Sequence, residues 1–159
     1  MSVAFTKESD AEAVAADLPD RPIPAHANLV TPRGLVQIDA ELATARAAYA
    51  AAQAGDAISA DRTAMARATR DLRYWSARRA SAQVIDVQPA GDTVVFGNRV
   101  SLERADGRTL SYAIVGDDEA DPASGSVSYV APLARALIGK GLGDVVTLAG
   151  QEVEIIGIS

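Results

Sequence analysis

Two stretches of the chain, one on each side of Gly55-Asp56, repeat a seam-forming side chain every three or four residues. The first runs through Leu35, Ile38, Leu42, Ala45, Tyr49 and Ala52. The second runs through Ile58, Asp61, Met65, Ala68, Leu72, Trp75, Arg79 and Ala82. This period is typical of a coiled-coil seam. Two such helices joined by a short turn predict an antiparallel helical hairpin over residues 31–82.

The amino end of the first helix is marked by Thr31-Pro32-Arg33-Gly34. Thr31 suits the N-cap position, and Pro32 suits the first helical position because no partner is needed there for its missing N–H. Large apolar side chains gather near this open end, whereas alanine and arginine fill many seam positions elsewhere. We therefore expect the base of the hairpin to be firmer than its tip. The expected anchors are Leu35, Ile38, Leu72 and Trp75.

Residues 1–30 precede the hairpin and are predicted to be a tail followed by a proline-rich linker. Pro19, Pro22 and Pro24 favour extended backbone and end any helix before them. His26, the single histidine, is interpreted as a solvated linker residue, because no catalytic partner pattern accompanies it. The acidic start of the chain does not resemble a signal peptide, and no apolar run approaches the roughly 18 residues of a membrane span. We expect a cytoplasmic protein without membrane contact.

After Ala82 the pattern changes to short β-rich runs divided by turn residues. Asp106-Gly107, between two of these runs, is a strong hairpin signal. One short helix is predicted at 132–138, where a proline leads and glycines follow. The predicted strands are 83–87, 93–96, 100–103, 109–115, 126–130, 145–148 and 152–158. The sequence thus predicts an α+β protein, in which residues 83–159 form a compact antiparallel sheet with one helix.

Composition narrows the classes of function. The 159 residues are 48% hydrophobic and 23% charged, which fits one or two small folded domains. The chain has no cysteine, so disulfides, thiolate metal sites and cysteine nucleophiles are excluded. Its formal charge of -6 argues against autonomous sequence-specific DNA binding, because such binding draws much of its affinity from counterions released at phosphates. Any nucleic-acid contact is expected to be local and held in place by a protein partner.

Four segments between Ser81 and Lys140 resemble the C-terminal half of the bacterial Gre transcript-cleavage factors. They are Ser81-Ala82-Gln83-Val84-Ile85-Asp86-Val87, Val95-Phe96-Gly97, Tyr112-Ala113-Ile114-Val115-Gly116-Asp117-Asp118-Glu119-Ala120-Asp121 and Ala131-Pro132-Leu133-Ala134-Arg135-Ala136-Leu137-Ile138-Gly139-Lys140. The resemblance implies an N-terminal coiled-coil hairpin and a C-terminal domain similar to the FKBP fold. It also implies a partner, RNA polymerase. The globular domain would dock on the rim of the polymerase secondary channel, with the hairpin reaching toward the active site.

In the Gre family two acids at the hairpin tip help hold a catalytic Mg²⁺ of the polymerase and activate the water that cuts backtracked RNA. The family tip usually reads Gly-Asp-x-x-Glu-Asn-Ala, whereas this chain has Gly55-Asp56-Ala57-Ile58-Ser59-Ala60-Asp61. The resemblance assigns Asp56 as one tip acid and places Ser59, a neutral hydroxyl, at the second. Asp61 is a partial substitute, and an alternative placement puts the tip on residues 58–61. No metal or cofactor of the protein's own is expected, only assistance to the Mg²⁺ of the polymerase.

Arginines recur along the second predicted helix. By resemblance, a basic patch on the hairpin contacts the 3′ end of the nascent RNA, and the forked donors of arginine suit phosphate. The alternative is a solvated helix face whose charge balances Asp39, Glu41 and Asp71. The row consists of Arg62, Arg67, Arg70, Arg73, Arg78 and Arg79, of which the first four are assigned to RNA.

The acidic run at residues 116–121 lacks the alternating ligand spacing of a calcium loop, so we interpret it as a surface turn beside a docking face. Val130 lies two positions before Pro132, where the Gre family often has a polar residue. The resemblance assigns polymerase docking to Asp117, Asp118, Glu119, Pro132 and Arg135.

Three functions follow as hypotheses. The predicted hairpin is shorter than that of typical Gre factors by roughly two heptads in total. Shared between the two arms, this removes about seven residues from each, or about 10 Å of reach at 1.5 Å per residue. Together with Ser59, this length favours a Gre-type elongation regulator that binds polymerase but stimulates cleavage weakly or not at all, and that is not itself an enzyme. The alternative is a fully active cleavage factor that works through Asp56, with or without Asp61. A prolyl isomerase is suggested by the FKBP-like fold alone, and the chain has only two Phe and one Trp to line a pocket.

Overall fold

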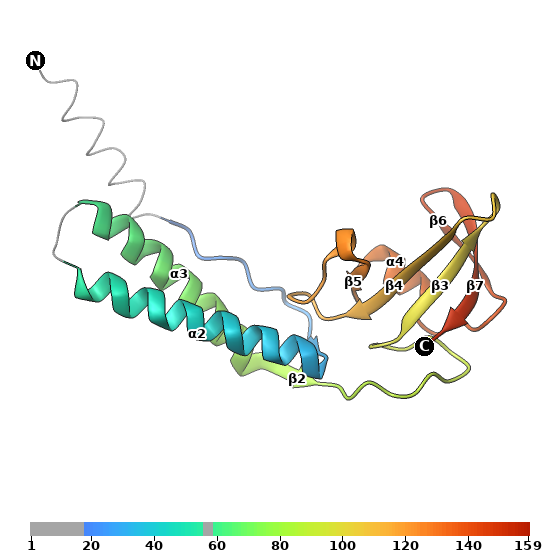
Figure 1. The fold of residues 1–159 in the computed structure, drawn as a ribbon, viewed down its shortest axis with the longest axis horizontal. Helices are drawn as coiled ribbons and strands as arrows, with labels where there is room; N and C mark the ends of the chain where they lie inside the picture. Colours follow the sequence, from blue (N-terminus) through green and yellow to red (C-terminus); the bar gives the residue numbers. More distant parts are fainter. Residues whose placement is uncertain (1–17, 56–58) are drawn as a thin grey trace, which may run out of the picture. The chain divides into compact units, whose positions relative to one another are not determined.

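The computed structural model describes residues 18–55 and 59–159, and for residues 59–61 the backbone alone (Figure 1). Contacts divide the chain into two compact units. Of the described residues, one unit contains 18–26 together with those of Ile38–Ser81, and the other contains Ala27–Gln37 together with Ala82–Ser159. No helix within the described ranges is long and apolar enough to cross a lipid bilayer.

The helical hairpin consists of α2 (Pro32–Ala54) and α3 (Ser59–Ser81), each of 23 residues. On α2 the predicted seam is turned away from solvent, because helical periodicity places its members on one face. On α3 the same pattern holds from Met65 to Trp75. The buried seam residues are Ile38, Leu42, Ala45 and Ala68, and the half-buried ones are Leu35, Tyr49, Ala52, Met65, Leu72 and Trp75. The predicted hairpin is confirmed.

The helix start at Thr31 is also as expected. The N–H of Gly34 donates to Thr31 Oγ1 at 2.9 Å, and the N–H of Leu35 donates to the Thr31 carbonyl at 2.9 Å. The first bond satisfies one of the free N–H groups of the first turn, which is the function of an N-cap.

The seam differs from the prediction at the base of α3. Arg79 was expected on the seam, but its side chain is 46% exposed and its Nε donates to Asp39 Oδ1 on α2 at 2.5 Å. Arg78 is buried instead, with 1% of its surface exposed. Two seam paths connect Trp75 with Ala82. If the first spacing is three residues and the second four, the seam residue between them is Arg78; if the first is four and the second three, it is Arg79. Spacing alone could not distinguish the two paths.

The segment before α2 and the segment after α3 form a short parallel pair of strands. Strand β1 (Asn28–Val30) runs directly into α2, and β2 (Ala82–Val84) directly follows α3. Beyond the pair, the N–H of Ile85 donates to the Val30 carbonyl at 2.9 Å. The segment containing β1 was predicted to be linker, because a strand of three residues after several prolines has no detectable period.

The C-terminal unit contains a five-stranded sheet in the order β5-β4-β3-β7-β6. The strands are β3 (Arg99–Arg104), β4 (Thr109–Val115), β5 (Ser126–Ser128), β6 (Val145–Leu148) and β7 (Gln151–Ile158). The β3–β4 turn contains Asp106-Gly107, as predicted, and Gly107 adopts a φ of 79°, which glycine tolerates. The α+β prediction is confirmed. One pairing differs from an antiparallel sheet, since β5 runs parallel to β4 and the sheet is therefore mixed.

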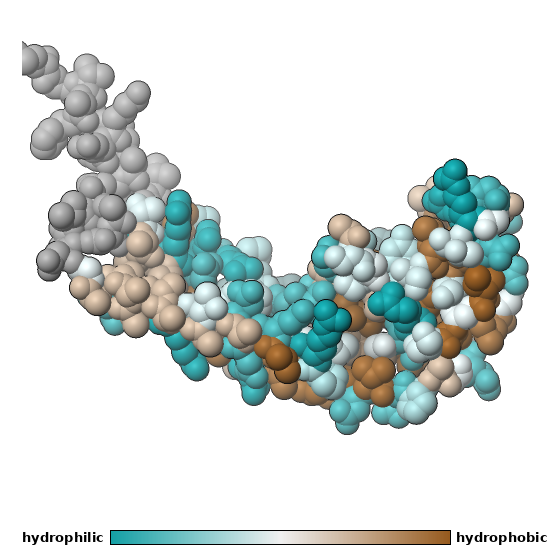
Figure 2. All heavy atoms as spheres, viewed as in Figure 1, coloured by the Kyte–Doolittle hydropathy of each residue, from teal (hydrophilic) through white to brown (hydrophobic). Residues whose placement is uncertain are grey.

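The core of this unit lies where one face of the sheet meets α4 (Pro132–Leu137). Alternate residues Val100 and Leu102 of β3 are fully buried, and Ala134 and Leu137 of α4 pack into the same cluster. Apolar side chains also reach the surface of this unit, as the brown patches in Figure 2 show. The predicted strand at 93–96 is reduced to a single bridge between Thr93 and Gly141.

Candidate functional site

The two predicted tip acids, Asp56 and Asp61, lie in or beside the segment that the structure leaves undescribed. Asp56 lies outside the described residues. Asp61 belongs to α3, and the structure describes its backbone but not its side chain. The assignment of both residues therefore stays a prediction.

The arginine row lies along α3, and two of its four RNA-assigned members contact carboxylates. Arg70 Nε is 3.5 Å from Asp71 Oδ1, and Arg73 Nη1 is 3.2 Å from Asp20 Oδ1. Arg62 and Arg67 have exposed side chains. The face thus combines cations that are open to solvent with cations that are balanced by nearby acids. RNA contact by this row stays a prediction.

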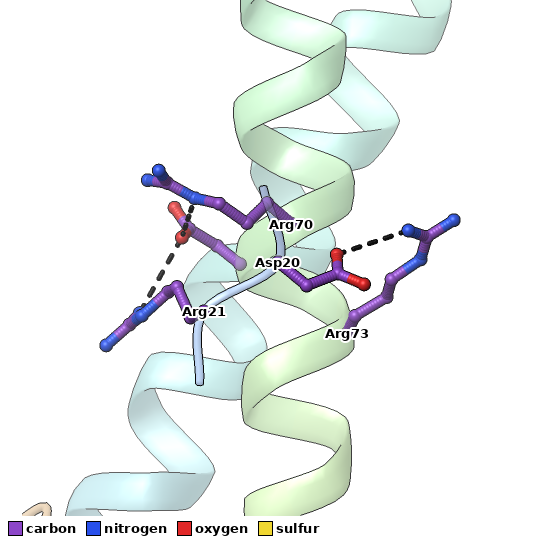
Figure 3. A network of polar contacts seen from close by, with 5 residues as sticks. Asp20, Arg21, Arg70 and Arg73 are labelled. Carbon is purple, nitrogen blue, oxygen red and sulfur yellow. Dashed lines mark hydrogen bonds and ion pairs between the residues drawn. The ribbon is translucent and has the colours of Figure 1, made fainter. Parts of the chain in front are cut away.

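Residues Asp20 and Arg21 of the predicted linker lie against α3 (Figure 3). Arg21 Nη1 is 3.6 Å from Asp71 Oδ1, so Asp71 lies between Arg21 and Arg70. The Arg21 guanidinium carbon lies 3.8 Å from the centroid of the Tyr74 ring and 5.2 Å from that of Trp75. These distances are those of a cation over an aromatic face. We call residues 20–21 the strap; sequence reasoning missed it, because a lone arginine between prolines has no periodic signal.

Replacing Arg21 with alanine is expected to release the strap. The loss of the cation–π contacts with Tyr74 and Trp75 and of one partly exposed ion pair with Asp71 predicts a decrease of about 1 kcal/mol in the free energy of unfolding. Trp75 is the single tryptophan, so its fluorescence emission reports directly on the site. We expect its emission maximum to move to longer wavelength. Arg33→Ala, which removes an exposed arginine elsewhere, is the matched control, and equal spectra for both variants would contradict the contact.

The acidic turn at residues 117–121 is held by hydroxyl groups. Thr31 Oγ1 donates to Glu119 Oε2 at 2.5 Å, linking this turn to the first residue before α2. Ser128 Oγ donates to Asp117 Oδ1 at 2.5 Å, and Ser124 Oγ donates to Asp121 Oδ2 at 2.6 Å. The described residues contain no group of three or more acids, histidines or cysteines arranged for a metal ion. The turn therefore has intramolecular partners that the sequence pattern did not reveal.

Helix α4 positions the remaining docking candidates. Pro132 and Arg135 are exposed, while Ala134 and Leu137 of the same helix are buried in the core. The buried pair fixes the helix to the sheet and leaves its other side open to a partner. Docking by Asp117, Asp118, Glu119, Pro132 and Arg135 stays a prediction.

Comparison with known proteins identifies the family. The family model described as "Transcription elongation factor, GreA/GreB, C-term" matches residues 88–159. The transcription elongation factor GreA of Desulfovibrio desulfuricans is 41% identical over 112 residues, which cover 67% of this chain and 68% of that protein. The chain belongs to the GreA/GreB family. All five docking candidates lie inside the residues matched by the family model, whereas the tip acids and the arginine row lie outside them.

Other GreA/GreB relatives match over a smaller share of their length. GreA of Thioalkalivibrio sulfidiphilus is 46% identical over 94 residues, which cover 55% of this chain and 60% of that protein. GreA of Anaeromyxobacter is 51% identical, and the chain spans 46% of its length.

Among solved structures, the crystal structure of GreA factor homolog 1 of Thermus thermophilus matches 84% of this chain and 99% of that chain, at 21% identity and a TM-score of 0.41.

Proposed function

We propose that this chain is a Gre-type transcription elongation regulator that binds RNA polymerase at the rim of the secondary channel. It docks through its C-terminal domain and inserts the hairpin toward the active site. There it stimulates transcript cleavage weakly or not at all. It acts in the cytoplasm as an accessory factor rather than an enzyme, and any Mg²⁺ involved belongs to the polymerase.

The polymerase part of the proposal is supported by the 41% identity with GreA of Desulfovibrio desulfuricans. The matched share, 67% of the chain, is larger than the share formed by residues 82–159, so the match extends into the hairpin. A factor that keeps both the hairpin and the C-terminal domain keeps the two parts that the proposed binding mode requires.

The weak-cleavage part is supported by the tip sequence. Gly55-Asp56-Ala57-Ile58-Ser59 supplies one carboxylate where the family pattern has two. A serine hydroxyl is neutral, so it does not supply the second hard anionic ligand that would help hold Mg²⁺ and activate its water.

The test uses purified protein, core RNA polymerase and stalled, backtracked elongation complexes. We expect binding to polymerase with little added RNA cleavage. Ser59→Glu restores the second carboxylate and is expected to raise the cleavage rate about tenfold or more, equivalent to about 1.4 kcal/mol of transition-state stabilisation. Ser59→Gln, similar in size but neutral, is the matched control and is expected to have no such effect.

Other outcomes decide against the proposal or modify it. Robust cleavage by the unchanged protein that disappears in Asp56→Ala supports the alternative, a fully active cleavage factor. Cleavage that survives this substitution moves the site to Asp61 or elsewhere. Absence of polymerase binding overturns both versions.

Docking is tested separately by charge reversal on α4. Arg135→Glu is expected to weaken polymerase binding because Arg135 is exposed on the open side of α4. Arg108→Glu, at the exposed β3–β4 turn, is the control for a change of charge alone. Equal binding by both variants would remove Arg135 from the interface.

A further inference from the structure

The short helix α4 does not cover the whole apolar face of the C-terminal sheet. It has six residues, and beside it lies a hollow of about 470 Å³. This volume is within the range of pockets that hold small organic molecules. The walls are mainly apolar and include Leu110, Tyr112, Leu133, Ala136, Leu148 and Val153.

Strand register explains why an arginine borders this hollow. Arg104 is the last residue of β3, and it pairs with Val153 of β7 two residues after the fully buried Leu102. Side chains two residues apart on a strand point to the same face, so Arg104 lies on the core face of the sheet. Among the residues that line the hollow, all of them within the described ranges, Arg104 is the one that carries a charge.

One nitrogen of the Arg104 guanidinium, Nε, is buried without an acceptor in the described part of the chain. Arg104 also borders two smaller hollows whose linings include Glu103, Asp106, Glu152 and Glu154. The described part of the chain nevertheless contains no ion pair between these acids and Arg104. A buried donor without a partner is unfavourable, and a carboxylate is the acceptor that matches the forked donors of arginine.

We propose that this hollow binds a small apolar carboxylic acid. The carboxylate pairs with Arg104, and the hydrocarbon body lies along Tyr112, Leu148 and Val153. The apolar walls provide affinity in proportion to the hydrocarbon buried, and the single arginine selects an anion over a neutral molecule of the same shape. Pro132, one of the docking candidates, also lines the hollow, so the proposed ligand site and the proposed docking surface share this residue.

Titration of the purified full-length protein with octanoate and with 1-octanol tests the proposal. Isothermal calorimetry is expected to give octanoate about tenfold tighter binding than octanol, because a hydrogen bond to a charged group is stronger than a neutral one. From butanoate to octanoate, affinity is expected to rise about fourfold for each added methylene. Equal binding of acid and alcohol, or no dependence on chain length, would overturn the proposal.

Variants locate the site. Arg104→Gln is expected to lower octanoate affinity about tenfold and to leave octanol unchanged. Arg108→Gln, on the same β-hairpin but exposed, is the matched control. Ala136→Leu fills part of the hollow from α4 and is expected to weaken both ligands, so the proposal remains testable even where Arg104→Gln disturbs folding. Unchanged binding in both Arg104→Gln and Ala136→Leu would place any octanoate elsewhere on the protein.

Discussion

Replacing Leu137 with alanine is expected to lower the free energy of unfolding of the C-terminal domain by about 2–5 kcal/mol. Leu137 is fully buried and belongs to the core cluster between α4 and the sheet. The substitution removes buried hydrocarbon and leaves a cavity that the neighbouring residues fill only in part. Urea or thermal unfolding measures the change.

Leu142→Ala is the matched control for Leu137→Ala. Leu142 is 61% exposed, so the same chemical change there is expected to alter stability by about 0.5 kcal/mol or less. Under the proposed function, Leu137→Ala also weakens polymerase binding, because the core anchors the helix that carries Pro132 and Arg135. Similar stability for the two variants would contradict the packing of α4 against the sheet.

Gly116→Ala is expected to displace β1 and lower the free energy of unfolding by about 1–3 kcal/mol. A Cβ added to Gly116 would lie 2.4 Å from the carbonyl oxygen of Leu29, and Leu29 belongs to β1. The obstacle is backbone rather than a flexible side chain, so the strand itself has to move. Hydrogen exchange then reports the change: the amide of Ile85, which donates to the Val30 carbonyl, is expected to lose protection.

Gly91→Ala provides the comparison for Gly116→Ala. A Cβ at Gly91 meets nothing within 4 Å, so this variant is expected to keep its stability or gain slightly from a less flexible unfolded chain. The amide of Ile114, which donates to the Asn98 carbonyl within the C-terminal core, is expected to stay protected in both variants. Retained protection of Ile85 in Gly116→Ala would show that β1 tolerates the added methyl group.

Local patterns predicted much of the fold. The three-and-four spacing placed Ile38, Leu42 and Ala45 on a buried face, because the period of an α-helix depends only on neighbouring residues. Thr31 and Asp106-Gly107 were recognisable for the same reason, since capping and tight turns are set within a few residues.

Features that depend on distant residues could not be predicted. Strand β1 forms only because β2 lies beside it, and the parallel orientation of β5 depends on its pairing with β4. Three-residue strands carry too little pattern to be distinguished from loop. The choice of Arg78 over Arg79 for the buried face required the packed helices.

The features of the candidate site also fall into those that the sequence predicts and those that only the folded structure shows. The sequence alone revealed the tip pattern with Asp56 and Ser59, the arginine row and the likeness to the Gre family. These features depend only on which residues occur and in what order, and not on the folded structure. The strap on Tyr74, the bond from Thr31 to Glu119 across 88 positions and the hollow beside Arg104 arose only in the folded molecule. Each of these joins residues far apart in the chain, and the free energy of such contacts depends on tertiary distances that local composition does not encode.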